Sequence, residues 1–280
     1  MDIIQTIIMG IVQGLSEFLP ISSSAQLVFT SNFYKVIKGI EIVENTNQEA
    51  FLDIMLHLGT LIAVLIYFRK DIANIIKAFI YGIKNKDYSS KDFKEGLYII
   101  IGTFITVIVA FPLMKAAEFL LFKPAVVGGL LIITGFLLLF SEYVSKRISG
   151  KKEISLKSSL LIAFAQGLAS LPGFSRSGLT ISTGLFLGSD RTTAARYSFL
   201  LSIPIILGAS MVYPLIKIDF AEVVTYNWAA IIAGTITSAV VGYLCIKYFL
   251  KFVSKFSLAC FGYYCLIAGI ITSVFFSVYQ

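Results

Sequence analysis

The sequence predicts an all-α polytopic membrane protein with an inverted repeat of two halves, each a re-entrant helical hairpin plus three transmembrane helices. Hydrophobic residues make up 57% of the 280 residues and charged residues only 14%, whereas a soluble domain carries about a quarter of charged residues. Apolar stretches long enough to span a bilayer recur along the chain, and a polar motif near the N-terminus returns in the second half. We therefore expect one membrane domain over residues 1–280, with repeat halves 1–143 and 157–280.

Eight apolar regions define the expected elements. Two of them, 2–33 and 158–188, are interrupted in the middle by proline, glycine and a cluster of hydroxyl residues. Proline lacks a backbone N–H and disfavours helix in the residue before it, so we expect each to be a hairpin that enters and leaves the membrane on one side. The uninterrupted segments that should cross lie at about 50–68, 97–114, 124–142, 193–216, 226–246 and 257–279.

The distribution of lysine and arginine predicts the orientation. The net charge of +7 resides in short loops between apolar segments, which argues against nucleic acid as a partner and is typical of membrane topology signals. Basic residues outnumber acidic ones in three loops, which should therefore be cytoplasmic: 69–95, 142–157 and 247–255. Acidic residues prevail in 34–49 and 217–225. We thus expect a multi-pass protein of the plasma membrane with both termini outside, hairpin 2–33 entering from outside and hairpin 158–188 from the cytoplasm.

An internal repeat relates the two hairpins. The run from Gln13 to Ser24 resembles the run from Gln166 to Ser177, with one residue deleted before the proline. Each half has three crossings, and an odd number of crossings turns the second half upside down. Many transporters have this plan, with sites near the midplane at broken helices. The tips of the two hairpins are expected to meet there.

Two ionisable residues belong to the hairpin interruptions. Glu17 precedes the first break and Arg176 lies inside the second; ionisable residues at membrane depth are functional candidates by default. The Arg176 guanidinium matches phosphate oxygens, Ser175 and Ser177 add hydroxyl donors, and Gly173 lets the backbone approach an anion at a helix start. The alternative is a Glu–Arg pair that only pins the two hairpins together.

Other polar residues could complete a phosphate site. The run Ser22-Ser23-Ser24 could cap a helix or provide a nucleophile and phosphate donors. Gln13 and Glu17 share a helix face, and a carboxylate beside phosphate is naturally bridged by a divalent metal with oxygen ligands. His57, the single histidine, is either a structural hydrogen-bonding group or a proton-transfer group.

Four motifs together resemble one known family. Residues 14–24, 51–60, 172–178 and 198–204 look like the undecaprenyl-diphosphate phosphatase family of the bacitracin-resistance type, and the resemblance covers nearly the whole chain. It implies removal of the terminal phosphate from a polyprenyl diphosphate lipid, which regenerates the monophosphate carrier for cell-wall glycan export. It also implies a homodimer, a site open to the outer face and a divalent cation, Mg²⁺ or Ca²⁺.

The resemblance also implies roles for single residues. Glu17 matches the second acidic position of the family, and Gln13 matches the first, which is Glu in some members and Gln in others. Ser23 matches the proposed nucleophile, and Ser175 and Arg176 match the phosphate-binding pair. We expect Glu17 to bind the metal and Glu17, Ser23 and Arg176 to be catalytic. The other expected substrate-binding residues are Gln13, Ser22, Ser24, Gln26, Gly173, Ser175 and Ser177.

One position departs from the family pattern. The serine run usually continues with Gly-His, whereas this chain has Ala25-Gln26. Glutamine cannot take a proton, although it can orient a phosphate or a water, so His57 becomes a candidate for proton transfer. Two functions stay open: a polyprenyl-diphosphate phosphatase and a non-catalytic polyprenyl-phosphate transporter that uses the same site. An ion channel is disfavoured, because the chain lacks a filter-like carbonyl sequence or a ring of like charges.

Overall fold

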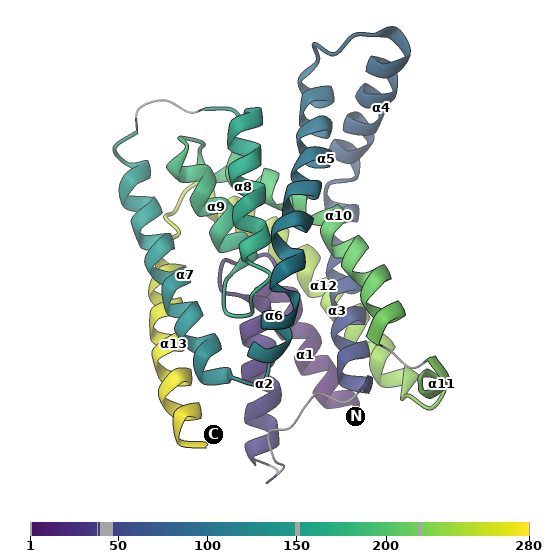
Figure 1. The fold of residues 1–280 in the computed structure, drawn as a ribbon, viewed down its shortest axis with the longest axis vertical. Helices are drawn as coiled ribbons and strands as arrows, with labels where there is room; N and C mark the ends of the chain where they lie inside the picture. Colours follow the sequence, from purple (N-terminus) through teal and green to yellow (C-terminus); the bar gives the residue numbers. More distant parts are fainter. Residues whose placement is uncertain (1, 38, 40–46, 149–151, 218–219, 280) are drawn as a thin grey trace.

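The computed structural model is a bundle of helices that run roughly along one axis (Figure 1). It describes residues 2–37, 39, 47–148, 152–217 and 220–279. Within these residues the regular secondary structure is helical, and six helices are long and apolar enough to cross a membrane. Each overlaps one predicted span, which confirms the polytopic membrane class: α3 (Asn47–Tyr67), α5 (Lys91–Ala110), α7 (Pro124–Ser145), α10 (Arg191–Lys217), α12 (Trp228–Val253) and α13 (Ala259–Tyr279).

Both interrupted regions form two helices with a short break between them. The first consists of α1 (Ile3–Ser16) and α2 (Ser23–Ile37), and the second of α8 (Leu156–Leu168) and α9 (Arg176–Phe186). The breaks contain Pro20 and Pro172, as the sequence predicted. The two connecting loops lie near the centre of the bundle (Figure 1).

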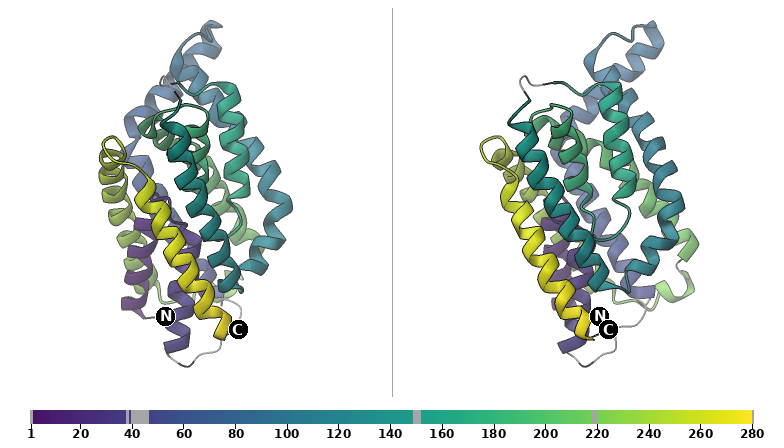
Figure 2. Two further views of the ribbon diagram at one scale, coloured as in Figure 1. Left: turned by 90° about the vertical axis from the view of Figure 1, so that its left-hand side faces the viewer. Right: turned by 60° about the vertical axis from the view of Figure 1, so that its left-hand side comes forward.

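Helices from the two halves of the chain pack against each other. Helix α1 lies along α12, α8 lies along α5, and α7 lies along α13; α7 and α13 run side by side in both views of Figure 2. At the α1–α12 contact, a Cβ on Gly14 would stand 2.9 Å from the backbone nitrogen of Gly242. Small residues at such crossings let two membrane helices approach closely.

One segment differs from its predicted form. The region 69–95 was expected to be a cytoplasmic loop, but Arg69–Asn85 forms helix α4, which packs on α5 through the stacked rings of Phe79 and Phe93, 5.1 Å apart. Its apolar residues recur at helical intervals, which explains the helix: Ile72, Ile75, Ile76, Phe79, Ile80 and Ile83.

Short elements complete the chain. After α5 the chain continues through η1 (Phe111–Leu113), where Pro112 interrupts the helix, into α6 (Met114–Leu120). Helix α11 (Phe220–Val223) precedes α12. The charged loops used for the orientation are described only in part, because residues 40–46, 149–151 and 218–219 lie outside the described residues.

Candidate active site

The first break turns the chain so that its two helices face each other. Ser22 adopts φ 64°, a left-handed conformation that costs a non-glycine residue about 1–3 kcal/mol and is often found at functional sites. Its Oγ accepts a hydrogen bond from the Ala25 nitrogen at 3.3 Å, which caps α2. This sharp turn brings Ser23 back to Glu17, and Ser23 Oγ donates to Glu17 Oε2 at 2.8 Å.

The second break is held by α7. Gly173 has φ 102°, and a Cβ there would clash with the backbone carbonyl of Val127, so only glycine fits. Thr134 of α7 donates from Oγ1 to the Gly173 carbonyl at 3.3 Å and accepts from the Ser175 nitrogen at 3.2 Å. Ser175 in turn caps α9, because its Oγ accepts from the Gly178 nitrogen at 3.0 Å. These contacts place Arg176 at the first position of α9.

The two breaks touch, as the sequence predicted for the hairpin tips. Ser177 Oγ in the second hairpin donates to the Leu19 carbonyl in the first at 2.9 Å. In the opposite sense, Ser22 Oγ donates to the Phe174 carbonyl at 3.2 Å. Side-chain hydroxyls of each break therefore satisfy backbone oxygens of the other.

Glu17 lies at the centre of this contact and is 6% exposed. Arg176 Nη2 donates to its Oε1 at 2.5 Å, while Gln13 Nε2 donates to its Oε2 at 2.9 Å. Two buried polar atoms beside it, Arg176 Nη1 and Gln13 Oε1, have no hydrogen-bond partner among the described residues. Buried polar atoms nearly always have partners, so this arrangement leaves one donor and one acceptor for a ligand.

The single histidine also reaches the site. His57 Nε2 lies 3.7 Å from Glu17 Oε2, and its Nδ1 lies 2.7 Å from the Asp53 carbonyl oxygen. A carbonyl can only accept, so Nδ1 carries a hydrogen. The other ring nitrogen, Nε2, faces the Glu17 carboxylate.

Two of the expected substrate-binding residues also have partners within the protein. Gln26 donates from Nε2 to the Ile21 carbonyl at 2.9 Å and accepts from the Tyr264 hydroxyl at 2.9 Å. Its amide thus links the first break to α13. Gly173 lies against α7, as described above. Ser24 stays near the break, with its Oγ 3.3 Å from that of Ser22.

Sequence reasoning missed three residues of this region. Thr134 and Tyr264 gave no signal, because a single threonine or tyrosine in an apolar helix is common and its partners are remote in sequence. Asp53 could have been found, since it is an acidic residue inside a predicted span. Its Oδ1 is buried and has no partner in the described part of the chain.

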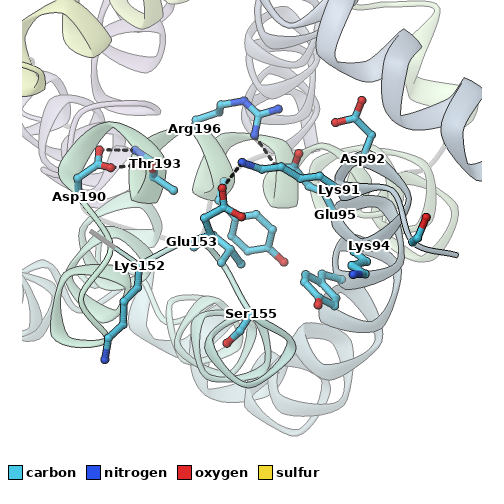
Figure 3. Close-up of a pocket in the computed structure, with 14 residues that line it drawn as sticks. Lys91, Asp92, Lys94, Glu95, Lys152, Glu153, Ser155, Asp190, Thr193 and Arg196 are labelled. Carbon is cyan, nitrogen blue, oxygen red and sulfur yellow. Dashed lines mark hydrogen bonds and ion pairs between the residues drawn. The ribbon is translucent and has the colours of Figure 1, made fainter. Parts of the chain in front are cut away.

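Two cavities lie near charged residues, and the smaller one is lined by His57, whose Nε2 lies 3.7 Å from Glu17 Oε2. The larger, about 890 Å³, is formed near the starts of α5 and α10 and contains none of the expected site residues. Some of its charged groups pair with one another: Lys91 Nζ lies 2.6 Å from Glu153 Oε1 (Figure 3), and Arg196 Nη1 lies 2.5 Å from Glu95 Oε1. The smaller cavity, about 160 Å³, is lined by Ser24 and His57. We therefore assign the larger cavity no part in the site.

The described residues contain no group of three or more His, Cys, Asp or Glu side chains that could hold a metal ion. Glu17 and the unpartnered Gln13 Oε1 nevertheless provide two neighbouring oxygen ligands. Magnesium sites often use only one or two carboxylates and take other oxygens from substrate phosphates and water. The residues present therefore fit a cation that binds together with a phosphate.

Comparison with known proteins identifies the family. The profile described as bacitracin resistance protein BacA matches residues 6–271. The chain is 41% identical to the undecaprenyl-diphosphatase of Methanosphaera stadtmanae, over 98% of both chains. It is 42% identical to that of Methanobrevibacter smithii, over 97% of this chain and 96% of the relative, and 41% identical to that of Halothermothrix orenii, over 96% of both. The chain therefore belongs to the BacA family of bacitracin resistance proteins.

Proposed function

We propose that this protein hydrolyses an undecaprenyl-type polyprenyl diphosphate to the monophosphate and inorganic phosphate in the membrane. The products would return the lipid carrier to cell-envelope glycan synthesis, and the activity would oppose bacitracin. The observation that carries the proposal is the contact of Arg176 with Glu17 at 2.5 Å, which joins two breaks that are remote in sequence. The names of the relatives, undecaprenyl-diphosphatase, support an enzyme rather than a non-catalytic transporter.

Phosphate binding follows from the donors that remain free. Arg176 keeps Nη1 available while Nη2 holds Glu17, and a guanidinium binds phosphate oxygens through more than one nitrogen. Arg176 also stands at the first position of α9, where backbone N–H groups and the helix dipole favour an anion. The terminal phosphate of the lipid therefore binds between the two breaks.

Glu17 is placed to accept the proton of the attacking hydroxyl. Ser23 Oγ already donates to Glu17 Oε2 at 2.8 Å, so its proton can move to the carboxylate as the oxygen attacks phosphorus. A water in the same position would be activated in the same way. In either case a new P–O bond forms, the anhydride P–O bond breaks, and the monophosphate lipid leaves. A serine attack requires a water to hydrolyse the phosphoserine afterwards.

We propose that a divalent cation, Mg²⁺ or Ca²⁺, binds with the diphosphate, held on the protein side by Glu17 and Gln13. When bound, it would neutralise phosphate charge and polarise the phosphoryl group. The support is the unpartnered Gln13 oxygen beside the Glu17 carboxylate.

The membrane arrangement proposed from the sequence has structural support. The packing of α1 on α12 mirrors that of α8 on α5, as expected if the halves 1–143 and 157–280 form an inverted repeat with re-entrant hairpins. Helix α1 begins and helix α13 ends on the same side of the bundle (Figure 1), which supports termini on one side, placed outside by the charge distribution. A homodimer is proposed on the family resemblance, and chemical cross-linking in membranes would test it.

One assay tests the function. The purified chain is incubated with polyprenyl diphosphate and a divalent cation, and released phosphate is measured. We expect turnover in the wild type and none in Glu17→Gln, which keeps the side-chain size but cannot accept the proton. Absence of phosphate release by a folded wild type would leave the transporter as the better explanation.

A further inference from the structure

Three ionisable residues form a stripe along α3 that ends at the active site. Glu49, Asp53 and His57 are spaced four residues apart, which places them on one face of the helix, about one turn from each other. The stripe begins near the start of α3 and reaches Glu17 at its inner end through His57, 3.7 Å away. Polar side chains at membrane depth generally line a hydrated path or a functional site.

Helix α2 contributes hydroxyl groups to the facing surface. Ser24 and Ser31 are seven residues apart, two helical turns, and therefore point the same way. Together with the stripe they enclose the cavity of about 160 Å³, which has room for several water molecules. Its lining consists of Met9, Ser24, Leu27, Val28, Ser31, Asn32, Glu49, Asp53, His57 and Leu121.

The size of this cavity suits water rather than the lipid. Clefts that hold drug-sized ligands have volumes of about 300–1,000 Å³, and a diphosphate with its first prenyl units needs comparable space. Asp53 Oδ1 is buried at the cavity without a partner among the described residues. Buried polar atoms without a protein partner are commonly satisfied by ordered water.

We propose that the cavity between α2 and α3 delivers the water consumed in the reaction, and that Asp53 is a positioning residue for that water. This inference rests on the proposed phosphatase function. It holds for both nucleophiles, because a water attacks either the diphosphate or a phosphoserine on Ser23. In each case the water oxygen forms a bond to phosphorus and the water gives a proton to Glu17. The bond between phosphorus and the leaving oxygen, which belongs to the lipid phosphate or to Ser23, breaks.

The cavity extends from the start of α3 to the residue that follows Ser23. Ser24 lines it directly after Ser23, whose hydroxyl contacts Glu17 at 2.8 Å. At the other end, Lys35 of α2 lies 3.5 Å from Glu49 and balances its charge. Water held by Asp53 would therefore lie between Glu49, near the start of α3, and Ser24, the neighbour of Ser23.

The test uses variants of the cavity with methanol as a second nucleophile. Asp53→Leu removes the acceptor at nearly constant size, and Ser31→Leu narrows the cavity; Ser277→Leu makes the same change at an exposed position of α13. The full-length protein is assayed with polyprenyl diphosphate and Mg²⁺, and inorganic phosphate and methyl phosphate are both measured. Methyl phosphate forms when methanol replaces water in the bond to phosphorus.

We expect Asp53→Leu to lower kcat by about tenfold or more with KM nearly unchanged, since misplaced reacting groups lose large factors in rate. Its melting temperature should not fall, because the variant removes a buried carboxylate oxygen that has no partner. In Ser31→Leu the ratio of methyl phosphate to phosphate should fall by about threefold or more, as the larger nucleophile is excluded. Ser277→Leu should match the wild type.

Two results would overturn the inference. The first is a wild-type kcat in Asp53→Leu. The second is Ser31→Leu with both a wild-type product ratio and a wild-type kcat. If Asp53→Leu does not fold, the Ser31→Leu result alone tests the inference. If the wild type forms no methyl phosphate, the kcat values of the two variants decide. Since the wild type must release phosphate in all these assays, its failure to do so would count against the proposed function instead.

Discussion

Arg176→Lys separates phosphate binding from simple pinning of the two hairpins. Arg176 holds Glu17 through Nη2 at 2.5 Å and leaves the buried Nη1 without a described partner. Lysine keeps the positive charge and can pair with Glu17, but its single ammonium cannot also reproduce the second nitrogen of the fork. Loss of one donor to a developing phosphoryl charge costs about 2.7–4 kcal/mol, or about 10²–10³ in kcat.

A second buried pair in the same protein provides the control. Arg191 contacts Glu142 through Nε at 2.7 Å and Nη2 at 2.6 Å, and this Glu142 also accepts from the Leu258 nitrogen at 2.9 Å. The pair joins the end of α7 to the start of α10, away from Glu17. Arg191→Lys therefore breaks a two-nitrogen contact with a buried carboxylate outside the proposed site, whereas Arg176 contacts Glu17 through one nitrogen.

Both variants are assayed for phosphate release and for thermal unfolding in detergent. We expect Arg191→Lys to lose at least as much stability as Arg176→Lys, because it breaks two hydrogen bonds rather than one, and only Arg176→Lys to lose turnover by the factor above. An Arg176→Lys protein with kcat/KM within about threefold of the wild type, well below the loss expected for a phosphate donor, would refute the assignment and leave a pinning role.

Three further outcomes are expected. Gly173→Ala should lower the melting temperature, because the φ of 102° and the Val127 carbonyl of α7 exclude a Cβ. Gly129→Ala should not, because a Cβ there would meet no atom within 4 Å. Equal melting temperatures of the two variants would contradict the geometry. Ser23→Ala should lower kcat by about 10²–10⁴ in a protein that still folds, although loss of the hydrogen bond to the buried Glu17 should lower its melting temperature. Near-normal phosphate release would exclude both a nucleophilic and a positioning role for the hydroxyl. Chelation with EDTA should stop phosphate release, and Mg²⁺ should restore it. Calorimetry without lipid should detect little Mg²⁺ binding, because Glu17 and Gln13 are the only proposed protein ligands. Full activity in EDTA would remove the cation from the proposal.

The features that could be predicted from the sequence depend on local properties. The spans follow from apolar length, and the two breaks follow from Pro20 and Pro172 in otherwise apolar regions. The pairing of Glu17 with Arg176 was one of the contacts expected, because a charge at membrane depth needs a partner and each break offered one.

The features that could not be predicted depend on contacts between remote segments. Gln26 is expected at the phosphate because of its place after the serine run, and its amide oxygen also accepts from Tyr264 of α13, 238 residues away, a contact that no motif indicates. Thr134 supports the second break from α7 through two hydrogen bonds that no sequence motif indicates. Helix α4 was not predicted, because the charged residues of this segment indicate a loop between spans, although its isoleucines recur at helical intervals.

The pinning and phosphate-binding interpretations of the Glu17–Arg176 pair are compatible. An incoming phosphate that had to displace Glu17 from Arg176 would leave a buried carboxylate partly uncompensated, and breaking such a pair costs about 3–5 kcal/mol. The structure avoids this competition, because one guanidinium nitrogen holds Glu17 while the other is free, and Gln13 and Ser23 hold the second carboxylate oxygen. The ion pair can therefore persist while phosphate binds, so the contact that joins the hairpins also orients the donor for the substrate.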